Sequence, residues 1–64
     1  MSTNQKWEPL ETPEAVLTAF EAGRDVEYRI PLESKWLRSY FPEFAAMNLS
    51  DGVEYRALVE GVEP

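Results

Sequence analysis

The chain has 64 residues and contains neither cysteine nor histidine, a combination that limits what it can fold into. A domain of about 60 residues buries only about 60% of the surface that its unfolded chain exposes, which leaves room for one small core. Without cysteine, no disulfide or thiolate metal site can reinforce that core, as is usual in a reducing compartment. We therefore expect residues 1–64 to form a single domain that folds without a cofactor.

The same composition argues against several classes of function. Histidine and cysteine are the commonest transition-metal ligands and histidine is the commonest general base, so we predict no metal site and no catalytic residues. Acidic residues outnumber basic ones by 12 to 6, and the net charge of −6 opposes direct binding to DNA or RNA phosphates. No apolar run approaches the length of a signal-peptide core or a membrane span, so we expect a cytoplasmic protein without membrane contact.

A helix is predicted to begin after Thr12. This residue is a suitable N-cap, Pro13 fits the first helical position, where no N–H is needed, and Glu14 places a negative charge in the first turn. The spacing i, i+3, i+4, i+7 predicts one buried stripe, made of Pro13, Val16, Leu17 and Phe20. The expected polar face comprises Glu14, Thr18 and Glu21. Ala22-Gly23 then predicts the end of the helix.

Two segments alternate with a period of two and share the tetrapeptide Val-Glu-Tyr-Arg, at 26–29 and 53–56. Such alternation predicts half-buried strands over residues 26–30 and 53–59, the first of them ended by Pro31. If the strands are neighbours, opposite charges on their outer faces pair across the sheet and stabilise it by about 0.2–1 kcal/mol per pair. The residues expected on that outer face are Glu27, Arg29, Glu54 and Arg56.

The stretch between these strands is the most ambiguous. Residues 35–40 fit either a middle strand or a short helix capped by Ser34, and their aromatic density favours the strand. Residues 42–48 begin with a proline and contain good helix formers, so one or two helical turns are expected there. In that helix, Phe44 and Met47 are expected to face the core.

Together these elements predict an α+β fold. An N-terminal amphipathic helix packs on a small antiparallel sheet of two or three strands, with a short second helix at 42–48. Residues 1–8 lack periodicity and are expected to form a flexible arm, although Trp7 and Leu10 could fold back onto the core as a lid. Residues 61–64 are expected to be a tail.

One layout covers residues 13–59: a helix with a glycine stop, a strand ending in Tyr-Arg, a tryptophan and a closing strand with Tyr-Arg. Its residues are Phe20, Gly23, Val26-Glu27-Tyr28-Arg29, Trp36 and Glu54-Tyr55-Arg56. The layout resembles that of many small uncharacterised proteins encoded by bacteriophages. The resemblance implies a phage or mobile-element origin, where acidic miniproteins commonly inhibit host defence, as anti-CRISPR and anti-restriction proteins do. Residues 41–48 depart from the more polar connection of that layout, and no active-site residues carry over.

Acidic residues gather toward both ends of the chain and suggest the leading function. Carboxylates two apart on strands, or three to four apart on helices, lie roughly 5–7 Å apart, near the phosphate spacing of a nucleic-acid strand. With the resemblance, this predicts an inhibitor whose DNA-mimicking surface occupies the basic DNA-binding groove of a host protein or nucleoprotein complex. The residues predicted for that surface are Glu8, Glu11, Glu14, Glu21, Asp25, Glu27, Glu54 and Glu60, with Glu63 as a further candidate. The competing interpretation is that the acids only keep a small protein soluble.

The aromatic middle segment offers an alternative. Trp and Tyr side chains often anchor protein interfaces, so Trp36 and Tyr40 could be the contact of a small non-catalytic interaction or assembly module, either monomeric or homodimeric. Because other large side chains are scarce, the favoured interpretation instead places most of this segment's aromatic residues in the core: Trp36, Tyr40, Phe41 and Phe44. Salt separates the two functions, since a charge-mimicking contact weakens with ionic strength and an aromatic one does not.

Overall fold

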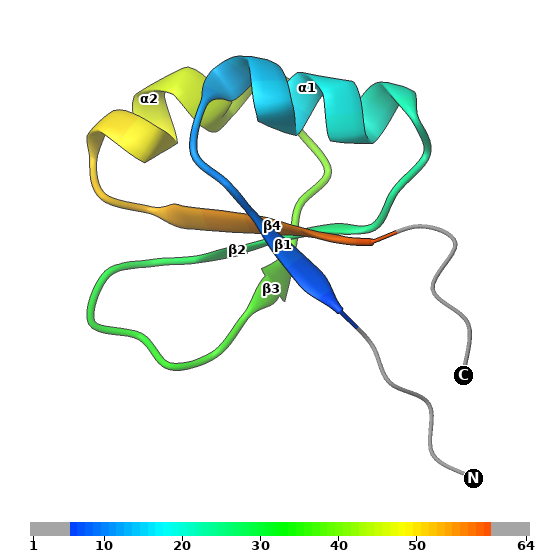
Figure 1. Cartoon of the computed structure of the whole chain (residues 1–64). Helices are drawn as coiled ribbons and strands as arrows, with labels where there is room; N and C mark the ends of the chain where they lie inside the picture. The colour runs from blue at the N-terminus through cyan, green and yellow to red at the C-terminus, as the bar shows by residue number, and fades with distance from the viewer. Residues whose placement is uncertain (1–5, 60–64) are drawn as a thin grey trace, which may run out of the picture.

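The computed structural model of the protein describes residues 6–59. Its elements in chain order are β1 (Trp7–Leu10), α1 (Pro13–Glu21), β2 (Val26–Arg29), β3 (Leu37–Arg38), a 3-10 helix η1 (Pro42–Phe44), α2 (Ala45–Ser50) and β4 (Glu54–Leu58). The strands form one 4-stranded antiparallel sheet in the order β1-β4-β2-β3, and α1 and α2 lie on the same face of it (Figure 1). The predicted α+β class is confirmed, with one strand more than the sequence indicated.

The additional strand is β1, which corrects the predicted arm at two of its residues. Trp7 and Glu8 pair with Leu58 and Ala57 of β4, so they belong to the sheet. Local patterns indicate this strand only weakly, because β1 is four residues long, contains a proline and pairs with residues far along the chain. Of the two residues of the lid alternative, Leu10 is buried in the core, whereas Trp7 lies on the other face of the sheet against Arg56. The first five residues of the arm and the predicted tail at 61–64 lie outside the described residues.

The two Val-Glu-Tyr-Arg segments lie side by side in β2 and β4. Their antiparallel register is centred on Tyr28 opposite Tyr55, which places Glu27 opposite Arg56 and Arg29 opposite Glu54. When two Glu-Tyr-Arg segments pair antiparallel with their tyrosines opposite each other, the glutamate of each segment lies opposite the arginine of the other. The repeat therefore encodes both the pairing and its charge complementarity, as predicted.

Helix α1 begins and ends where the sequence predicts. The Thr12 Oγ1 accepts a hydrogen bond from the Ala15 N–H (3.1 Å), and Gly23 follows the helix with φ of 76°, in the left-handed region that favours glycine. The predicted stripe is only half right, because Val16 is buried and Phe20 packs against the core, whereas Pro13 and Leu17 are exposed. Ala19 is buried in their place, since a small side chain lets the helix approach the sheet closely.

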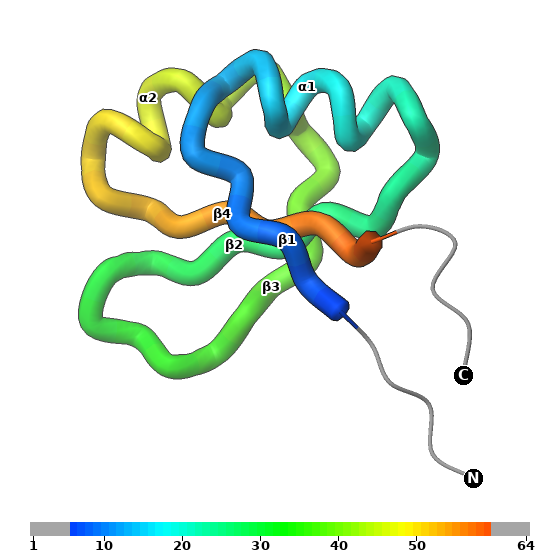
Figure 2. The backbone as a smooth tube through the Cα atoms, in the orientation of Figure 1, coloured from blue at the N-terminus to red at the C-terminus, as the bar shows by residue number. Residues whose placement is uncertain are grey.

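The middle of the chain contains both elements expected of it, with different side chains inside. A strand forms at Leu37–Arg38, and the helical turns after Pro42 are η1 and α2. Figure 2 shows the chain between β2 and β3 as a wide loop that extends away from the helices. The prediction that Phe44 and Met47 face the core is wrong, because both are exposed and Ala45 is buried instead. Apart from Tyr55, the core is built of small and medium side chains; its members are Leu10, Val16, Ala19, Val26, Ala45, Tyr55 and Ala57.

Candidate functional site

Several residues of the predicted acidic surface are already paired within the protein. Each of four carboxylates meets an arginine, in the pairs Glu8–Arg24 (2.7 Å), Asp25–Arg38 (2.8 Å), Glu27–Arg56 (2.6 Å) and Glu54–Arg29. Two of these pairs follow from the β2–β4 register, whereas Glu8–Arg24 and Asp25–Arg38 join segments that the sequence does not relate. An acid that is matched internally presents less negative potential to a partner, so half of the predicted surface is weakened as a phosphate mimic.

Apart from Glu33, in the loop between β2 and β3, the acids without an ion pair among residues 6–59 lie in or next to the helical segments. Residues 11–23 and 42–52, which contain η1 and both α-helices, include no lysine or arginine. The acids of these two stretches are all exposed: Glu11, Glu14, Glu21, Glu43 and Asp51. Three of them were predicted site residues, and Glu60 lies outside the described residues. The helical layer is therefore uniformly negative, while every described arginine is tied to an acid.

The face of the sheet without helices, here called the open face, carries both tryptophans. The Arg56 guanidinium lies 4.2 Å from the ring centroid of Trp7 and 4.1 Å from that of Trp36, and Arg29 lies 5.0 Å from Trp36. These distances are typical of cation–π contacts. Trp36 is half-buried by this stacking, so it is neither a core residue nor part of one surface with Tyr40. The structure separates the two residues of the predicted aromatic contact.

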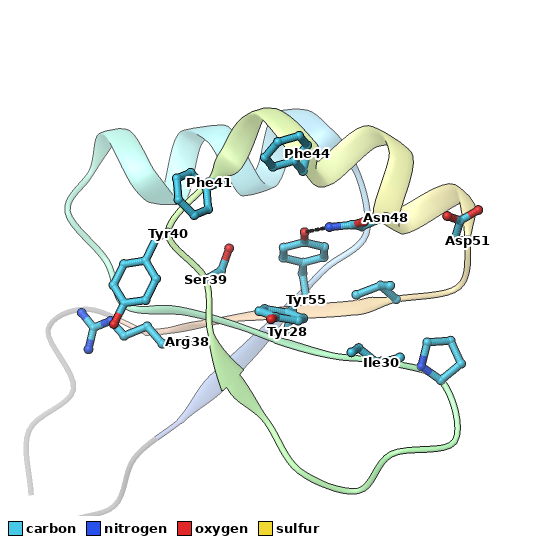
Figure 3. A pocket seen from close by; sticks show the side chains of 12 residues that line it. Tyr28, Ile30, Arg38, Ser39, Tyr40, Phe41, Phe44, Asn48, Asp51 and Tyr55 are labelled. Atoms are coloured by element: carbon cyan, nitrogen blue, oxygen red, sulfur yellow. Dashed lines mark hydrogen bonds between the residues drawn. The ribbon is translucent and has the colours of Figure 1, made fainter.

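Tyr40 instead lines a groove between β2 and the helical segment formed by η1 and α2, here called the helix-side groove (Figure 3). Its volume is about 670 Å³. Tyr28 and Tyr55 form its floor, with ring centroids 6.2 Å apart. The residues that line it are Tyr28, Ile30, Pro31, Arg38, Ser39, Tyr40, Phe41, Phe44, Asn48, Asp51, Val53 and Tyr55.

The upper wall of the helix-side groove is aromatic. Phe41 and Phe44 pack edge to face, with centroids 6.0 Å apart, and both remain exposed to solvent. Tyr40 is 68% exposed and Phe41 58%, so the expectation that these aromatic residues fill the core is wrong. The helical side chains buried against the sheet include Ala19 and Ala45, whereas the larger rings remain exposed.

Few polar groups reach into the groove. Asn48 Nδ2 donates a 2.8 Å hydrogen bond to the Tyr55 hydroxyl, which fixes the floor to α2 (Figure 3). Ser39 is buried, and its backbone N–H donates to the Val26 carbonyl at 2.9 Å. Arg38 lies at one end and is held by Asp25, while Asp51 lies at the other end. An apolar hollow with a few polar groups is typical of a binding site.

The sequence reasoning missed the floor and the far end of this groove. Ile30 and Pro31 marked only the end of the first predicted strand. Tyr28 and Tyr55 each lay only on the face of its strand opposite the charged residues. One signal could have pointed to them: antiparallel pairing of the repeat places Tyr28 and Tyr55 next to each other on one face of the sheet. Tyr55 is buried and Tyr28 is half-buried, so the helical segments cover this pair only in part.

The comparisons with known proteins do not relate the site to any described one. No protein-family model, no curated protein and no solved structure matches the chain. Within residues 6–59, no helix is both long and apolar enough to cross a membrane. The same residues contain no group of three or more acidic, histidine or cysteine side chains arranged to hold a metal ion.

Proposed function

We propose that this protein acts, without catalysis, by binding another protein at the helix-side groove. The observation that carries the proposal is the exposure of Tyr40, Phe41 and Phe44 around one apolar hollow. Large exposed apolar patches on small proteins mark interaction sites, and aromatic side chains anchor interfaces. A chain with so few large residues gains no stability from leaving three aromatic rings in water, so their position favours a contact with a partner.

A catalytic role for the groove has less support. A nucleophile needs an adjacent base, and the chain has no histidine or cysteine to serve as one or the other. The hydroxyl of Tyr55 accepts a hydrogen bond from Asn48, an arrangement that fixes the ring rather than activates it. The other hydroxyls in the lining belong to Tyr28, Ser39 and Tyr40, and none of them has an adjacent histidine to act as a base. These groups suit the orientation of a bound segment, which is why we propose binding alone.

A second candidate is the phage-type inhibitor of a host nucleic-acid-binding defence complex, of the anti-CRISPR or anti-restriction kind, acting in the host cytoplasm. The observation in its favour is that Glu11, Glu14 and Glu21 are exposed and unpaired among residues 6–59. These carboxylates lie in or next to the α1 side of the layer that lacks basic residues. They form the part of the predicted surface that retains its full negative potential, so DNA mimicry would operate there.

One capture experiment compares the two candidates. The parent and two variants are immobilised and exposed to bacterial lysate, with and without added DNA. Phe41→Gln with Phe44→Gln alters the groove, and Glu11→Gln with Glu14→Gln and Glu21→Gln removes the α1 charges. Leu17→Gln is the matched control, because Leu17 is an exposed apolar residue of α1 that does not line the groove.

For groove binding, we expect capture to fall at least tenfold in the phenylalanine variant, which corresponds to about 1.4 kcal/mol, and to stay unchanged in the control. For DNA mimicry, capture should instead fall in the glutamine triple variant, weaken steeply with salt and compete with added DNA. Circular dichroism of each variant confirms that the fold is retained. A folded phenylalanine variant that captures the same proteins as the parent would rule out the groove.

A further inference from the structure

The charge around the helix-side groove defines what kind of segment it can accept. Asp51 lies in its lining, and Glu43 lies in η1 beside Phe44 of the aromatic wall. The single basic residue of the lining, Arg38, is matched by Asp25 at 2.8 Å. The potential over the groove is therefore negative, although its floor is apolar. Such a surface is complementary to a segment that combines apolar side chains with lysine or arginine.

A second copy of this chain does not meet that description. Every copy carries a net charge of −6, and its helical segments, within residues 11–23 and 42–52, contain acids and no lysine or arginine. Two such layers brought face to face would place like charges together, which opposes association. The occupant is therefore a different protein with a basic surface.

Leu32 adds an independent observation next to the groove. It is a non-glycine residue with φ of 72°, in a turn closed by a 3.0 Å hydrogen bond from the Glu33 N–H to the Ile30 carbonyl. Proline followed by a residue at positive φ is the pattern of a type II turn, in which glycine or asparagine is preferred at the second position. A leucine there is strained, and this one is also fully exposed, so no intramolecular packing offsets the strain.

The strained turn lies at one end of the helix-side groove. Pro31, directly before Leu32, lines the end of the groove, and Ile30 lines it as well. Leu32 directly follows Pro31 and is fully exposed, so its side chain is available to a molecule bound at this end of the groove. Residues that violate a local rule without an internal benefit are expected at functional sites.

From these observations, and resting on the proposed function, we infer that the helix-side groove binds a basic amphipathic segment of its partner protein. The apolar side chains of that segment lie over Tyr28 and Tyr55 and against Leu32. Its lysine or arginine side chains face Asp51 and Glu43.

The test is a titration of the isotope-labelled protein with three short synthetic peptides, followed by backbone amide NMR. One peptide is amphipathic with leucine and lysine, one replaces lysine by glutamate, and one replaces leucine by serine. We expect the leucine–lysine peptide to shift the amides of Leu32, Phe44 and Asn48, and the other two to bind at least tenfold more weakly. Asp51→Asn and Glu43→Gln should each weaken the first peptide by about two- to fivefold, as for exposed charge pairs.

Leu32→Asn separates binding from folding. Asparagine tolerates positive φ, so the melting temperature should rise by a few degrees while the affinity for the leucine–lysine peptide falls about threefold or more. A variant that melts higher and still binds like the parent would remove Leu32 from the contact. Equal binding of the lysine and glutamate peptides, or shifts confined to the open face, would overturn the inference. The capture result with Phe41 and Phe44 remains a separate test of the proposed function.

Discussion

The two faces of the sheet are stabilised in opposite ways. On the helix-covered face, Tyr55 is the one large side chain among the buried residues, and the fully buried residues with the largest side chains are the valines Val16 and Val26. On the open face, the largest side chains of the protein, Trp7 and Trp36, both stack on the Arg56 guanidinium. Glu27 then pairs with Arg56 at 2.6 Å. One face excludes water by close packing, and the other covers its aromatic rings with arginine.

This difference shows how a short chain manages a sheet with two faces. Its helices suffice to cover one face only, so the other would expose apolar rings unless something lay over them. Planar guanidinium groups stack on aromatic faces while their edges stay hydrated or paired with carboxylates. Arginine side chains therefore cover the aromatic rings of the open face, in place of a second helical layer. We expect the covered face to supply most of the stability, and each prediction below tests that expectation.

The largest effect is expected from Leu10→Ala on the covered face. Leu10 is 4% exposed and lies opposite Tyr55, so its removal leaves a cavity where β1 meets the core. The free energy of unfolding should fall by about 2–5 kcal/mol, which is close to the whole stability expected of so small a domain. Urea denaturation followed by circular dichroism measures it. A loss below about 1 kcal/mol would mean that the β1 contact contributes little to the core.

A smaller effect is expected from Trp36→Ala on the open face. The variant loses the stacking on Arg56 and Arg29, which amounts to about 1–3 kcal/mol when the buried part of the ring is included. Tyr40→Ala is the matched control, because Tyr40 is an exposed aromatic residue on the other side of the sheet, and its stability should change by less than about 0.5 kcal/mol. Equal losses in the two variants would contradict a stabilising role for the stacked face.

The smallest effect is expected from Glu54→Gln, which removes the ion pair with Arg29. Both side chains are partly exposed, so the loss should be about 0.2–1 kcal/mol at low salt and should nearly vanish at about 1 M salt, where the Debye length is about 3 Å. Glu33→Gln serves as the control, since Glu33 is exposed and forms no ion pair among residues 6–59. A salt-independent loss in Glu54→Gln would indicate packing rather than charge.

The candidate site was less predictable than the fold. Tyr40 was identified as a possible contact, but it was grouped with Trp36, and only the pairing of β2 with β3 and β4 shows that these residues serve different faces. Of the predicted acids, Glu11, Glu14 and Glu21 remain unpaired among the described residues, while Glu8 and Asp25 meet arginines far along the chain or across a loop. Ion pairs of that kind depend on where segments meet in space, which no local pattern records.

The sequence by itself determined the local events: the helix start at Thr12 and Pro13, its end at Gly23, and the paired strands with complementary charges. Each depends on dihedral preferences, on the hydrogen bonds of neighbouring residues or on a repeat that aligns with itself. Only the tertiary structure decided which side chains are inside. Alanines occupy the interior between the helices and the sheet, and Leu17, Phe44 and Met47 remain outside. Hydrophobicity ranks these residues the other way, since it measures transfer from water and not the space available between two layers.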